Sequence, residues 1–124
     1  MKHGVWLAVL TVMAAGPARS ELPSAATFEG SGRACYGRLV LTPRTIAWTT
    51  PERRCPASAY AVVQPGVFRL KQSGRACRTP VIALRQHGPA GADGGWEALG
   101  YPSVQAFRAN DDSSVLSCGL VRLK

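Results

Sequence analysis

Four cysteines constrain this chain more than any other residues. The sequence has 124 residues, and its cysteines are Cys35, Cys55, Cys77 and Cys118. An even number of cysteines in a small exported domain indicates disulfides. No two of them have the C-x-x-C spacing that is typical of a zinc or redox-active site. We therefore predict two structural disulfides and no metal.

Four cysteines allow three connectivities, and their spacing alone does not select one. The turn residues Pro65-Gly66 predict a hairpin whose register places Cys55 one residue away from Cys77. The turn over residues 42–45 leaves Cys35 three residues out of register with Cys55. Hairpin geometry therefore favours one pairing, Cys55–Cys77 with Cys35–Cys118.

Residues 1–20 are typical of a signal peptide. A basic start is followed by the apolar stretch 5–15, and small residues stand at Ala18 and Ser20, before the expected cleavage site. The apolar stretch is too short to favour the alternative, a retained membrane anchor. We therefore expect a periplasmic or secreted protein that has no transmembrane segment after cleavage. Residues 21–26 are expected to form a flexible lead-in, and residues 27–124 a single disulfide-stapled β domain.

The chain is basic, and arginine dominates its positive charge. It has 15 Lys and Arg against 7 Asp and Glu, and Lys2 and Arg19 leave with the signal peptide, so the mature net charge is +6. Eleven of the 13 remaining cationic residues are arginines. Arginine suits bidentate contacts with carboxylates and phosphates. A genome rich in G and C would produce the same bias without selection for an anionic partner, and we weigh this explanation more heavily.

The mature sequence alternates short apolar segments with turn residues every eight to twelve positions, which is typical of small all-β domains. Residues 67–71 have the half-buried pattern of an edge strand. Residues 103–109 allow one or two helical turns capped by Ser103. Seven or eight short strands predict an all-β, mainly antiparallel barrel or sandwich. The expected strands cover residues 35–41, 45–50, 59–64, 67–71, 81–85, 96–101 and 115–123.

One pentapeptide occurs twice. Residues 31–35 and 73–77 both have the sequence Ser-Gly-Arg-Ala-Cys, and an apolar stretch follows each copy within a few residues. An ancient duplication would explain the repeat. Chance would explain it as well, because Gly, Arg and Ala are abundant here and the similarity does not extend beyond the pentapeptide.

No residues form a recognisable catalytic pattern. His87 is the only histidine of the mature chain, and it begins a Gly-rich loop that ends at Gly95. A catalytic role with Asp93 or Asp112 would need rigid support that such a loop does not supply. Nucleophile-elbow, P-loop and dinucleotide motifs are absent from the sequence. We predict that the protein is not an enzyme, needs no cofactor and, since it is exported, does not bind nucleic acid.

Three functions without catalysis remain open. The protein is first expected to be a binding module of unknown ligand that docks an anionic polymer or surface. In the alternative, it inhibits a secreted hydrolase by presenting Arg75, beside Cys77, to a trypsin-like pocket from a disulfide-pinned loop. In the third, it is a structural envelope protein whose arginines are only solvated. The arginines proposed to bind anions lie in or beside the first predicted hairpin: Arg33, Arg38, Arg44, Arg53 and Arg54.

Overall fold

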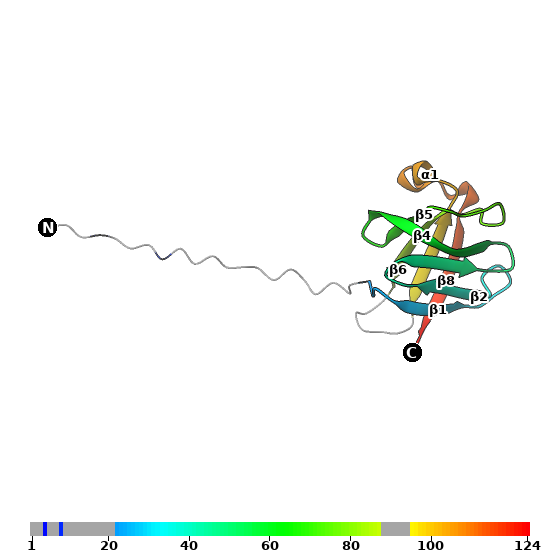
Figure 1. Ribbon diagram of the computed structural model, residues 1–124, viewed down its shortest axis with the longest axis horizontal. Coiled ribbons are helices and arrows are strands. Elements are labelled where there is room, and N and C mark those ends of the chain that lie inside the picture. The colour runs from blue at the N-terminus through cyan, green and yellow to red at the C-terminus, as the bar shows by residue number, and fades with distance from the viewer. Residues whose placement is uncertain (1–3, 5–7, 9–21, 88–94) are drawn as a thin grey trace.

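The protein folds into a closed barrel of eight antiparallel strands (Figure 1). The computed structural model describes residues 22–87 and 95–124, together with Gly4 and Ala8. The expected signal peptide, apart from those two residues, and most of the Gly-rich loop therefore lie outside the described residues. The strands are β1 (Ala26–Gly30), β2 (Gly37–Leu41), β3 (Thr45–Thr49), β4 (Arg54–Gln64), β5 (Val67–Leu70), β6 (Val81–Gln86), β7 (Trp96–Tyr101) and β8 (Leu116–Leu123).

Each strand pairs with its neighbours in the sequence, and β8 returns to β1 to close the barrel. The closing ladder pairs Thr27 with Leu123 and Gly30 with Leu120. Residues 67–71 were expected to form an edge strand, and this is wrong, because β5 pairs with both β4 and β6. A closed barrel has no edge strands.

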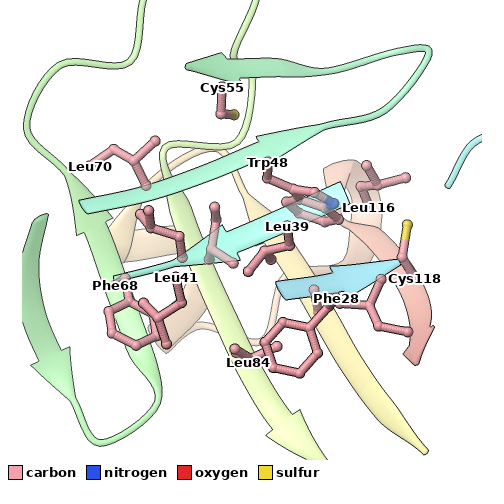
Figure 2. Packing of buried hydrophobic residues seen from close by; sticks show 14 of the residues in the cluster. Phe28, Leu39, Leu41, Trp48, Cys55, Phe68, Leu70, Leu84, Leu116 and Cys118 are labelled. Atoms are coloured by element: carbon pink, nitrogen blue, oxygen red, sulfur yellow. The ribbon is translucent and has the colours of Figure 1, made fainter. Parts of the chain in front are cut away.

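Alternation along the strands fills the barrel with apolar side chains. On β2 the buried Leu39 and Leu41 flank the exposed Val40, and on β3 Ile46 and Trp48 point inward. Figure 2 shows side chains from strands around the whole barrel meeting in one cluster. The buried residues of this cluster are Phe28, Leu39, Leu41, Ile46, Trp48, Cys55, Phe68, Leu70, Cys77, Ile82, Leu84, Trp96, Ala98, Leu116, Cys118 and Leu120.

A second, smaller cluster lies on the outer face of the barrel. On β6 every residue from Val81 to Leu84 is buried, because Ile82 and Leu84 face the interior while their neighbours pack outside. The short helix α1 (Val104–Arg108) covers this outer patch, and its Phe107 ring meets that of Tyr101 at 5.4 Å. The Ser103 side chain caps α1 by accepting a hydrogen bond from the backbone of Ala106, which confirms the expected helix and its cap.

Both preferred disulfides are confirmed, Cys35–Cys118 and Cys55–Cys77. They follow the same rule around the barrel. Cys35 lies after β1 and is bonded to β8, the strand before β1 in the closed ring, while Cys77 lies after β5 and is bonded to β4. Each disulfide therefore fixes the loop that leaves one strand to the neighbouring strand.

Removing the two disulfides separately should give unequal losses of stability. Cys35 and Cys118 are separated by 83 residues and Cys55 and Cys77 by 22, so the first bond restricts the unfolded chain more. We expect the Cys35→Ala, Cys118→Ala variant to lose about 1 kcal/mol more free energy of unfolding than the Cys55→Ala, Cys77→Ala variant. Urea unfolding monitored by tryptophan fluorescence measures both losses. A larger loss for the Cys55–Cys77 pair would contradict this prediction.

Candidate functional site

The two ends of the barrel differ in their loops. One end, here called the disulfide end, carries the connections 31–36, 50–53, 71–80 and 102–115, and both disulfides anchor there. The opposite end carries the tight turns 42–44 and 65–66, the end of β6, the start of β7, and both chain ends of the barrel. A site that needs shaped loops is therefore better served by the disulfide end.

The arginines expected to bind anions do not share one surface. Arg44 lies in the β2–β3 turn at the opposite end, whereas Arg33 and Arg54 belong to the disulfide end. The guanidinium of Arg38 lies 3.7 Å from Glu29, so its charge is already balanced. The side chain of Arg53 is only 16% exposed and lies 3.8 Å from its neighbour Glu52.

The segment 71–77 is fixed along β4. The hairpin register that pairs Tyr60 with Leu70 continues past the end of β5. The backbone of Lys71 donates to the carbonyl of Ala59 at 2.9 Å, and that of Gln72 donates to the hydroxyl of Ser58 at 2.9 Å.

Farther along the same segment, the Arg54 N–H donates to the Ala76 carbonyl at 2.9 Å, and Cys77 forms its disulfide with Cys55. Between these anchors the opposite strand presents Pro56, which has no N–H to donate. Gly74 there has a φ of +72°, a conformation that favours glycine. Residues 73–75 therefore form an arch that is held at both ends and is not paired in the middle.

A cavity of about 380 Å³ lies at this arch, beside the Cys55–Cys77 disulfide. β3 and β4 supply one wall, and the segment 73–76 supplies the other. We call it the arch pocket, and its lining residues are Thr49, Arg54, Pro56, Ser73, Gly74, Arg75 and Ala76.

Two arginines share the arch pocket without a counter-charge. Arg54 and Arg75 are both exposed, and within residues 22–87 and 95–124 neither makes an ion pair. Neither aspartate nor glutamate is among the described residues that line the pocket. The lining surface is mostly apolar, and two exposed arginines belong to the residues that form it. A guanidinium without an ion-pair partner can accept an anionic group as ligand.

The sequence selected both of these arginines, but for different hypotheses. Arg54 was expected to bind anions and Arg75 to present an inhibitory loop, and nothing in their spacing indicated a shared pocket. Their proximity follows from the Cys55–Cys77 bond, because each arginine lies within two positions of one of its cysteines. The contributions of Thr49 and Pro56 gave no sequence signal.

The first copy of the repeat has a different hollow beside it. Gly32 has a φ of +97°, as Gly74 has a positive φ in the second copy, and Cys35 likewise forms a disulfide. A smaller hollow of about 160 Å³ near it is lined by Glu29, Tyr36, Gly37 and Arg38. The charges of this hollow already balance each other through the Arg38–Glu29 pair.

His87 belongs to a different cluster, at the opposite end of the barrel. Its Nε2 lies 3.3 Å from a carboxylate oxygen of Glu97, and Arg85 holds the other oxygen at 2.7 Å. Although burial raises the pKa of Glu97, hydrogen bonds from Arg85 and His87 outweigh it and hold the pKa below its usual value. Asp112 lies at the disulfide end, so it does not form the catalytic pair considered for His87, and Asp93 lies outside the described residues.

Two features are absent from the part of the chain that the structure describes. Among those residues, no three His, Cys, Asp or Glu side chains gather in a way that could hold a metal ion. Nor does that part contain a helix of the length and apolarity needed to cross a membrane.

The Glu97 cluster should make stability sensitive to acid. Because the folded-state pKa of Glu97 is lowered, its stabilisation is present above the ordinary carboxyl pKa and is lost as the pH falls through the folded value. We expect Glu97→Gln to cost roughly 0.5–1 kcal/mol at pH 7 and little below pH ~3. Urea unfolding across this pH range measures the difference. A Glu29→Gln control, which removes an exposed pair, should lose less, and equal losses at both pH values would contradict the assignment.

Comparison with known proteins adds no relative to this description. No protein-family model, no curated protein and no solved structure matches the chain.

Proposed function

We propose that this chain is an exported, non-enzymatic binding protein that holds an anionic partner at the disulfide end of its barrel. The observation that carries the proposal is the arch pocket, whose lining includes Arg54 and Arg75, both exposed and without an ion-pair partner among the described residues. An exposed arginine is ordinary by itself. Two unpaired arginines that line one mostly apolar pocket beside a disulfide are better explained by a ligand.

The surroundings of the pocket support binding more than catalysis. The pocket lining includes neither histidine nor a carboxylate, so it supplies no general base of the usual kind. Its walls are anchored by a disulfide and by backbone hydrogen bonds to Arg54 and Ser58. A wall fixed before binding loses little conformational entropy on binding, which favours affinity.

Two disulfides suggest an oxidising environment, which agrees with an exported protein. The signal peptide expected over residues 1–20 would supply the export route. The net charge of +6 expected after cleavage would attract a negatively charged partner at low ionic strength.

The oxidised protein should bind an anionic polymer through the two pocket arginines. Polyglutamate and dextran sulfate are suitable probes, with neutral dextran as the uncharged control, titrated at low and moderate salt. We expect binding to both polyanions that weakens with salt. The Arg54→Ala, Arg75→Ala variant should raise the dissociation constant about tenfold.

A matched double variant distinguishes binding at the arch pocket from a general effect of net charge. Arg44→Ala with Arg69→Ala removes the same two charges from exposed positions outside the pocket lining. We expect this variant to bind nearly as well as the wild type. Equal losses in the two double variants would show that net charge, and not the pocket, determines binding, and no binding even at low salt would refute the proposal.

Inhibition of a trypsin-like protease is a second candidate function, and one observation favours it. Arg75 is exposed at the end of the arch. It directly precedes Ala76, whose carbonyl accepts a hydrogen bond from β4, and it lies two residues before Cys77, which forms the disulfide. A basic side chain on a segment held at both sides is suited to enter an acidic specificity pocket.

Substitutions at the two arginines distinguish this function from anion binding. An inhibitor should retain activity in Arg75→Lys, because a trypsin-like pocket accepts either cation, and lose it in Arg75→Ala. Arg54→Ala should leave inhibition nearly unchanged. Trypsin activity against a chromogenic substrate measures the effect. If Arg54→Ala reduced inhibition as much as Arg75→Ala does, this result would argue against the inhibitor function.

A further inference from the structure

We infer that the arch pocket binds a single carboxylate attached to an apolar group. The inference rests on the proposed function, since it uses the same two arginines. Two sources share this chemistry: a free aliphatic or aromatic acid, and the C-terminal residue of a peptide. In both, one planar anion must be bound next to an apolar body.

The size of the pocket limits the ligand. Its volume of about 380 Å³ is near the lower end of ligand sites, which range over roughly 300–1,000 Å³. Such a space holds a small molecule or one or two amino-acid residues. A polymer would therefore place only one of its groups in the pocket and leave the rest outside.

The lining combines two kinds of surface. Arg54 on β4 and Arg75 on the arch line the pocket from opposite walls, and most of the exposed lining surface is apolar. Pro56 and Ala76 add apolar surface, and Gly74 adds only backbone. A carboxylate can take paired hydrogen bonds from a guanidinium, while its apolar substituent removes Pro56 and Ala76 from water.

Other ligand classes fit this lining less well. A neutral apolar molecule would leave both arginines without a hydrogen-bond acceptor from the ligand. A phosphate without an apolar substituent would place its charged oxygens against Pro56, which offers no donor. An apolar acid uses the unpaired arginines and the apolar wall together.

The glycines of the two repeat copies provide a matched pair of test and control positions. Gly74 and Gly32 occupy matching positions in the two copies of the repeat, and both have a positive φ. A Cβ added at either one would meet no atom within 4 Å. Alanine therefore alters the backbone preference at each position without a clash, but only Gly74 lines the arch pocket.

The test compares acids with their amides. Benzoate and benzamide, and acetyl-Ala-Phe with a free or an amidated C-terminus, are titrated into the oxidised protein by calorimetry. We expect binding of at least one acid and none of its amide. Arg54→Ala and Arg75→Ala should each weaken binding about tenfold, and Gly74→Ala a few-fold, whereas Gly32→Ala and Arg44→Ala should not weaken it.

Each outcome decides between the possibilities. Binding of benzoate alone supports the inference with a free acid as the source, and tighter binding of the peptide acid supports it with a peptide C-terminus. Equal binding of acid and amide, or of neither, overturns it. If the polyanions still bind through Arg54 and Arg75 in that case, the proposed function stands; if they do not bind either, both fail.

Discussion

The pairing of β1 with β8 is the interaction on which the rest of the barrel depends. β1 has only five residues and one large apolar side chain, Phe28, which is fully buried. Its backbone nevertheless pairs with both β2 and β8, and this pairing removes the two edges that an open eight-stranded sheet would expose. Closure also encloses the core, where the rings of Phe28 and Trp96 lie 5.1 Å apart. Without this ladder the interior would open to water along its whole length.

The candidate site arises where regular pairing stops. The β4–β5 hairpin keeps its register beyond Leu70, but Pro56 cannot donate a hydrogen bond and Gly74 in the opposite segment has a positive φ. The disulfide and the Arg54–Ala76 hydrogen bond then restore contact farther along. A gap bounded on both sides by strong links is rigid as well as open, which are the two properties that a preformed binding site needs.

Local patterns were sufficient for most of the fold. The strand at residues 96–101 has the expected bounds, and the disulfides have the preferred pairing because hairpin register fixes which cysteines approach. The choice between barrel and sandwich could not be made, since it depends on contacts between β1 and β8, at the two ends of the mature chain. β1 itself was not recognised as a strand, because Phe28 alone shows no alternation. The sequence identified Arg54 and Arg75 singly, but the arch that joins them has no sequence pattern.

The spacing of the cysteines has a consequence for biosynthesis. In a chain exported N-terminus first, the thiol of Cys35 leaves the membrane with Cys55 and Cys77 following, while its proper partner Cys118 is 83 residues behind. Oxidation during such a passage would favour a Cys35–Cys55 bond, which would have to be exchanged when β8 arrives and the barrel closes. Under the proposed export, the yield of correctly bonded protein would then depend on disulfide exchange as well as on an oxidant.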